Sequence, residues 1–205
     1  MPRWSRDHLE LLALEPAFEA VYAQLGLLKR NVAKPFSPFN SLARSIVYQQ
    51  LSGTAAATIL SRVFLAAGSP DVLLPEHIDR LTDGEMRSAG ISGNKALALR
   101  DLSAKTVEGV VPDFPTLKRW SDEEIIEHLT QVRGIGVWSV QMMLIFWLGR
   151  PDVLPLADLG VQKGAMKLLG LAAVPSPKQL EQLGAKWAPQ RTLASLYLWK
   201  LADAR

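Results

Sequence analysis

Apolar residues recur at helical spacing along almost the whole chain, and no segment of useful length alternates with period two. Residues 7–25 carry apolar side chains at this spacing, at Leu11, Leu12, Phe18, Val21, Tyr22 and Leu25. The pattern predicts further helices over 42–47, 54–67, 76–81, 83–89, 95–107 and 121–132, and two more that begin at Ser176 and Pro189. We therefore predict an all-α fold of about ten helices and no sheet.

Two helix starts carry a specific signature. Ser121 precedes an apolar run and is followed three residues later by Glu124, which predicts a capping box. Ser176 stands in the same relation to Gln179, with Pro177 at the first helical position.

The domain organisation rests on length and on the prolines. A chain of 205 residues fits one helical domain over 1–205 and is long enough to bury a core. Pro112 and Pro115 interrupt the helical pattern. They allow an alternative of two lobes, about 35–112 and 1–34 together with 113–205.

Composition excludes several classes of protein. The chain has no cysteine, which excludes disulfides, a thiol nucleophile and a cysteine-ligated zinc or iron–sulfur site. The three histidines show no ligand spacing, so we expect no catalytic transition metal. The longest apolar run is too short to cross a membrane, and the charged N-terminus lacks a signal peptide's apolar segment, so we expect a cytoplasmic protein. The net charge of +3 and the pI of about 9.3 permit nucleic-acid binding without requiring it.

A glycine turn joins two of the predicted helices. Gly134 and Gly136 flank Ile135, and a long apolar helix follows. Glycines let another backbone approach closely, and the first N–H groups of the next helix attract an anion such as a phosphodiester. Ile135 is expected to anchor the turn in the core. A plain helix–turn–helix corner is the alternative interpretation.

A single carboxylate, Asp158, stands just before another helical pattern. Aspartate at such a position is a common N-cap. From spacing alone, the N-cap role and a chemical role both remain open for this residue.

Four motifs together resemble one family. They are Leu129-x-x-Val132-x-Gly134-Ile135-Gly136-x-Trp138 followed by Leu154-Pro155-x-x-Asp158; Ile46-Val47-Tyr48-Gln49-Gln50-Leu51-Ser52; Gly90-Ile91-Ser92-Gly93-x-Lys95; and Trp187-x-Pro189-x-Arg191-x-x-Ala194-x-x-Tyr197-Leu198-Trp199. In this order, over about 38–200, they are similar to the helix–hairpin–helix DNA glycosylases, in particular the 3-methyladenine DNA glycosylase II group. Longer members carry an N-terminal β domain, and we expect the helical core alone here.

The resemblance implies a base excision repair enzyme with its active-site cleft between two lobes. Asp158 matches the catalytic aspartate, which assists water in cleaving the N-glycosidic bond of alkylated bases such as 3-methyladenine and 7-methylguanine. Members that also cut the backbone have a lysine where this chain has Trp138. The resemblance therefore implies a monofunctional glycosylase without lyase activity, with no required cofactor and no iron–sulfur cluster.

The remaining site residues follow from the same resemblance. The flipped base is expected to lie against Trp138, Met142, Trp199, Tyr48 and Trp187. Gln50 or its neighbour Leu51 is the expected wedge that fills the gap in the duplex. Phosphate is expected at Gly134, Ile135 and Gly136, with Arg133 and Lys95 as basic contributors. A monovalent cation, Na⁺ or K⁺, is expected on the main-chain carbonyls of Thr130, Val132 and Ile135.

The expected partner is double-stranded DNA containing alkylated bases, bound by a monomer without membrane association. One alternative is a helix–hairpin–helix module that binds DNA without catalysis. Another is the same fold acting on uracil, mismatched or oxidised bases, and the sequence does not separate these substrates.

Overall fold

The computed structural model describes residues 4–69 and 71–204, and this part of the chain contains helices and no strands. Thirteen α-helices and one short 3-10 helix lie within it. The all-α prediction is confirmed. The backbone clusters into two compact units, one formed by residues 35–140 and the other by residues 1–34 with 141–205.

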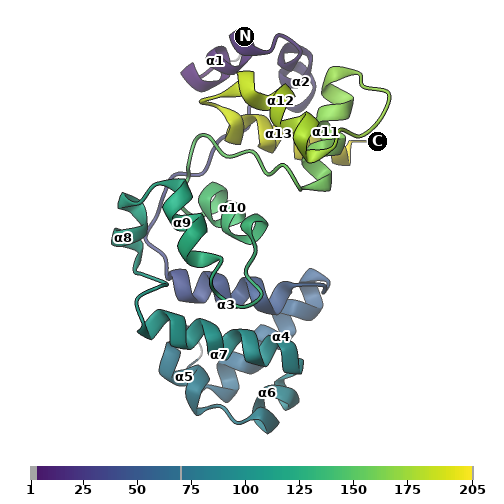
Figure 1. Ribbon diagram of the computed structural model, residues 1–205. Coiled ribbons are helices and arrows are strands. Elements are labelled where there is room, and N and C mark those ends of the chain that lie inside the picture. The colour runs from purple at the N-terminus through teal and green to yellow at the C-terminus, as the bar shows by residue number, and fades with distance from the viewer. Residues whose placement is uncertain (1–3, 70, 205) are drawn as a thin grey trace. The chain divides into compact units, whose positions relative to one another are not determined.

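The central unit, 35–140, is built around two helices that lie side by side, α3 and α7 (Figure 1). It contains α3 (Pro38–Tyr48), α4 (Gly53–Ala66), α5 (Pro75–Arg80), α6 (Asp83–Ala89), α7 (Gly93–Val107), α8 (Phe114–Arg119) and α9 (Asp122–Leu129). Helix α5 packs on α7, and α4 packs on α3 and α6. The buried face of α3 supplies much of the core, with Phe39, Leu42, Ala43, Ile46 and Val47 almost fully buried.

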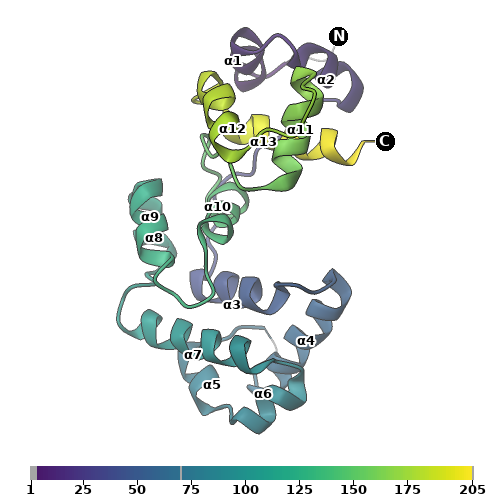
Figure 2. The same ribbon diagram turned by 45° about the vertical axis from the view of Figure 1, so that its right-hand side comes forward.

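The other unit combines the two ends of the chain. It contains α1 (Arg6–Leu14), α2 (Phe18–Leu25), α11 (Leu159–Leu169), α12 (Pro177–Gly184), the 3-10 helix η1 (Ala185–Trp187) and α13 (Arg191–Asp203). Helices α11 and α13 pack closely, which is visible in both views of the chain (Figure 2). Gly164 allows this approach, because a Cβ there would overlap the Leu198 backbone.

Helix α10 (Val137–Phe146) contains the boundary between the units. The two-lobe alternative to the predicted single domain placed this boundary near residue 112 instead. The segment after residue 112 is held to the central unit by specific contacts. The rings of Phe36 and Phe114 lie 5.4 Å apart, and the Arg133 N–H donates to Asp101 over 2.7 Å.

Local signals explain most helix boundaries. Both predicted capping boxes are confirmed: Ser121 with Glu124, and Ser176 with Gln179. The pattern over 7–25 is two helices rather than one, because Pro16 lies between α1 and α2. The first of these helices ends at Leu14. The sequence also missed α8, where Asp113 is the N-cap and Pro115 lies in the first turn rather than breaking a helix.

No helix in the described residues is both long and apolar enough to cross a membrane.

Candidate functional site

Asp158 lies at the N-cap of α11, in the unit formed by the chain ends. Its Oδ1 accepts a hydrogen bond from the backbone N–H of Val161 over 2.9 Å and another from the indole N–H of Trp199 over 2.8 Å. The residue is half-buried. The N-cap interpretation of the sequence is thus confirmed. The second donor is not needed for capping, and it fixes the orientation of the carboxylate.

Gly160 has no side chain and so leaves room for the contact between Trp199 and Asp158. A Cβ at this position would lie 2.8 Å from Cδ1 of Trp199 and 3.1 Å from Oδ1 of Asp158. The other side of the arrangement is aromatic: the rings of Trp199 and Phe146 are stacked, with centroids 5.7 Å apart. The sequence motifs named Trp199 but missed Gly160 and Phe146, since nothing local to either residue marks it as a partner of the indole.

Trp187 was predicted as a wall of the base pocket, and this prediction is wrong. Its side chain is fully buried in the core of the unit formed by the chain ends. Its ring meets that of Phe18 edge to face, with centroids 6.0 Å apart. The large apolar area of an indole explains this placement, because α2 and η1 would otherwise enclose a cavity.

The glycine hairpin, residues 130–136, connects α9 to α10. Gly134 has φ +78°, a conformation that other residues adopt only with strain. Ile135 is 5% exposed and anchors the turn as predicted, whereas both glycines are exposed. A Cβ on Gly136 would meet nothing within 4 Å. The hairpin therefore presents bare backbone to solvent at the start of a helix.

Other hairpin residues have mixed surroundings. The backbone N–H of Arg133 is bound to Asp101, and the residue is exposed. The carbonyl of Val132 accepts the N–H of Ile135 over 3.0 Å. Thr130 is the C-cap of α9. Among the described residues, no group of three His, Cys, Asp or Glu side chains is placed to hold a metal ion.

The first two turns of α10 carry the predicted aromatic and thioether side chains. Trp138 is 48% exposed and Met142 is half-buried, while their neighbour Ile145 is 1% exposed. Ile145 is therefore a core residue, whereas Trp138 presents an accessible aromatic surface in the first turn of α10, two residues after the hairpin.

The predicted wedge lies in the turn between α3 and α4. Gln50 has φ +57°, and within 4–69 and 71–204 it is the one non-glycine residue with a positive φ. Leu51 follows it and is 39% exposed. A strained, exposed turn of this kind is typical of functional sites.

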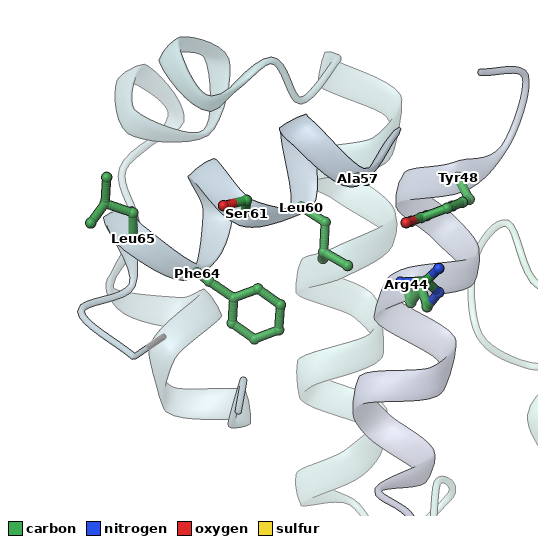
Figure 3. A pocket seen from close by; sticks show the side chains of 7 residues that line it. All are labelled: Arg44, Tyr48, Ala57, Leu60, Ser61, Phe64 and Leu65. Atoms are coloured by element: carbon green, nitrogen blue, oxygen red, sulfur yellow. The ribbon is translucent and has the colours of Figure 1, made fainter. Parts of the chain in front are cut away.

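Tyr48 ends α3 and lines a cavity of about 390 Å³ between α3 and α4 (Figure 3). The guanidinium of Arg44 lies 4.0 Å from the centre of its ring, a cation–π contact. Leu60 and Phe64 line the α4 side. The prediction that Tyr48 walls a base pocket gains no support from these contacts.

Lys95 makes hydrogen bonds to backbone carbonyls that the sequence did not predict. Its ammonium donates to the carbonyls of Val47 and Gln49, each over 2.8 Å. Burial lowers the pKa of this lysine. Two of its three N–H donors are therefore used inside the central unit, at the end of α3, rather than for a phosphate.

An exposed glycine hairpin at the start of α10, in a helical protein, is the arrangement expected of a helix–hairpin–helix protein. Residues 43–190 match the model of the HhH-GPD superfamily of base excision DNA repair proteins, and the chain belongs to this superfamily.

Relatives and solved structures agree with this assignment. The chain is 37% identical over 169 residues to DNA-3-methyladenine glycosylase 1 of Schizosaccharomyces pombe. The matched region covers 81% of this chain and 74% of that protein. A structure of the 3-methyladenine DNA glycosylase of the same yeast, in complex with abasic DNA, matches with a TM-score of 0.82 at 33% identity and 96% coverage of both chains. DNA-3-methyladenine glycosidase from Bacillus halodurans matches with a TM-score of 0.87 at 36% identity, covering 98% of this chain and 90% of that one.

Proposed function

We propose that this protein is a monofunctional DNA glycosylase that hydrolyses the N-glycosidic bond of alkylated purines, of the 3-methyladenine and 7-methylguanine type. The observation that carries the proposal is the carboxylate of Asp158, fixed by the N–H groups of Val161 and Trp199 in a chain 37% identical to a 3-methyladenine glycosylase. The protein acts as a monomer on double-stranded DNA in the cytoplasm or nucleoid.

The chemistry requires a fixed negative charge. Cleavage of the N-glycosidic bond builds positive charge on the deoxyribose, as in glycoside hydrolysis. Asp158 stabilises that charge near C1′ and orients the attacking water. The N–H groups of Val161 and Trp199 both donate to Oδ1, and together they fix the orientation of the carboxylate. An alkylated purine is cationic and leaves readily, so little further help is needed at the base.

Binding and flipping use the exposed backbone and the strained turn. The N–H groups around Gly134 and Gly136 bind phosphate without reading sequence. Gln50 or Leu51 enters the duplex and fills the gap left by the extruded nucleotide. Trp138, Met142 and Trp199 are each a proposed contact of the extruded base, and an aromatic surface favours a cationic purine.

No cofactor takes part in this reaction. A monovalent cation on the carbonyls of Thr130, Val132 and Ile135 is compatible with their chemistry, because hard cations prefer oxygen ligands. Such an ion would link the hairpin to a phosphate. Arg133, exposed within the hairpin, adds positive charge there.

The absence of lyase activity follows from Trp138, which stands where backbone-cutting relatives have a nucleophilic lysine. Borohydride should therefore trap no covalent adduct between this protein and abasic DNA. A trapped adduct would show that another amine of the chain acts as a nucleophile.

The proposal is tested by incubating methylated DNA with the protein and identifying the released bases by chromatography. We expect free 3-methyladenine and 7-methylguanine. A defined set of duplexes with uracil, mismatched thymine or oxidised purine separates the other substrate classes. Tight DNA binding without release of any base would instead establish a non-catalytic binding module.

A further inference from the structure

Lys95 connects the first turn of α7 to the end of α3, where the strained turn begins. The ammonium donates to the carbonyls of Val47 and Gln49 over 2.8 Å each. These carbonyls belong to the last turn of α3 and to its C-cap. A helix leaves its last carbonyls without internal donors, and a cation near that end also interacts favourably with the helix dipole.

The conformation that follows these carbonyls is costly. Gln50 has φ +57°, in the left-handed region that a side chain makes unfavourable. Strain of this kind persists only where the surrounding contacts over-determine the backbone. Lys95 fixes the residue immediately before Gln50 through its carbonyl, and it is therefore placed to hold the strained turn.

Gln49 links the same turn to the glycine hairpin. Its side-chain Nε2 donates to the carbonyl of Gly134 over 2.7 Å. All residues of this chain of contacts, from Lys95 through Gln49 to Gly134, belong to the central unit. Gln49 is thus held at two points, by Lys95 through its carbonyl and by Gly134 through its side chain. These two bonds fix the spacing between the turn that carries Gln50 and the hairpin.

We propose that Lys95 is a positioning residue for base flipping: together with Gln49 it holds the Gln50–Leu51 turn in its strained conformation, at a fixed distance from the phosphate-binding hairpin. The proposal rests on the proposed function, because it assigns Lys95 to the lesion-specific step of that function. Lys95 acts through the turn and contacts neither the base nor the sugar.

The alternative role, a direct phosphate contact by Lys95, makes a different prediction. Losing a phosphate contact weakens binding to every duplex alike and lowers the salt dependence of the affinity by about one unit of slope. Losing a positioning residue leaves binding to undamaged DNA unchanged. It removes the extra affinity for a duplex whose nucleotide is extruded.

The experiment compares Lys95→Met with Lys105→Met, a control that removes another lysine of α7, which pairs with Glu108. Binding is measured to an undamaged duplex and to one with an abasic-site analogue. A fluorescent purine analogue beside the lesion reports unstacking. For Lys95→Met we expect a loss of about tenfold in discrimination between the two duplexes, and affinity for undamaged DNA within about twofold of wild type. Lys95→Arg keeps donors for both carbonyls and should restore most of the fluorescence change.

Two further variants separate positioning from general damage to the fold. Gln49→Met removes the bond to Gly134 and should give a smaller loss of the same kind, with an unchanged melting temperature. A double-mutant cycle of Lys95→Met with Gln50→Ala should be non-additive, because both act through one turn. Additive effects, or equal losses on both duplexes, would overturn the proposal. If wild type itself gives no fluorescence change and releases no base, the proposed function fails, independently of Lys95.

Discussion

Trp199 shows how one side chain determines the orientation of another at this site. Its indole N–H donates to Asp158 across 41 residues of sequence, and Gly160 leaves the room for it. The sequence motifs indicated both residues. They could not predict the hydrogen bond, because it depends on the packing of α11 against α13.

The variant Trp199→Phe removes this donor and keeps an aromatic ring against Phe146. A hydrogen bond to a charged group contributes about 1.5–3 kcal/mol, so we expect base release to slow by roughly tenfold to a hundredfold. The measurement is a single-turnover rate on methylated DNA, with the affinity for undamaged DNA as control. An unchanged rate would show that the indole serves only packing.

A substitution at Gly164 tests the close packing of α11 against α13. A Cβ there would overlap the backbone of Leu198, so α11 and α13 would have to separate to make room for it. We expect Gly164→Ala to lower the free energy of unfolding by at least about 1–3 kcal/mol, although alanine has the higher helix propensity. The matched control is Gly53→Ala, where nothing lies within 4 Å of the new Cβ. Equal melting temperatures for the two variants would contradict the close packing of α11 and α13.

At the level of secondary-structure elements, a substitution in the hairpin can test DNA binding without changing the fold. Gly136→Val places its side chain in open space, so the protein should fold normally. The side chain would keep phosphate from the backbone, and we expect about tenfold weaker binding to damaged and undamaged duplexes alike. Gly84→Val, in the first turn of α6, is the control. A loss confined to particular base sequences would argue against phosphate binding at the hairpin.

Helix boundaries could be predicted from sequence where a local signal decides them. The boxes at Ser121 and Ser176 depend on side chains three residues apart, and both were correct. Prolines were ambiguous, since Pro16 separates two helices whereas Pro115 lies inside the first turn of one. Contacts distant in sequence, such as Lys95 to Val47 and Gln49, leave no local periodicity and were therefore missed.

At the scale of the whole molecule, a buried hydrogen-bond network joins the N-terminal helices to α13. The His8 Nε2 lies 3.0 Å from the Tyr197 hydroxyl, which donates to the carbonyl of Gly26 and accepts the N–H of Leu28. Since that hydroxyl already donates, His8 donates to it from Nε2, and Nδ1 faces the Ser5 hydroxyl at 2.6 Å. A neutral imidazole satisfies every partner.

Acid should therefore weaken the fold. Burial holds the pKa of His8 below its usual 6.5, although the negative charge of Asp7 acts to raise it. The unfolded chain then binds the proton more readily, so the contribution of His8 to stability is full above about pH 6.5 and is lost as the pH falls from there through the lower pKa of the folded state. We expect the melting temperature of wild type to fall more steeply between about pH 7 and pH 5 than that of His8→Gln. Parallel curves would show that another group governs the acid response.

If the Asp158 carboxylate performs the hydrolysis, the variant Asp158→Asn should lose the reaction and keep the fold. Asparagine is an equally good N-cap and can still accept the Trp199 N–H, so α11 and the fold should be retained. The measurement is the single-turnover rate of base release from methylated DNA, with affinity for abasic DNA determined in parallel. We predict a rate lower by about a hundredfold to a thousandfold with affinity within about twofold of wild type. A variant that releases alkylated bases at the wild-type rate would show that Asp158 does not perform the hydrolysis.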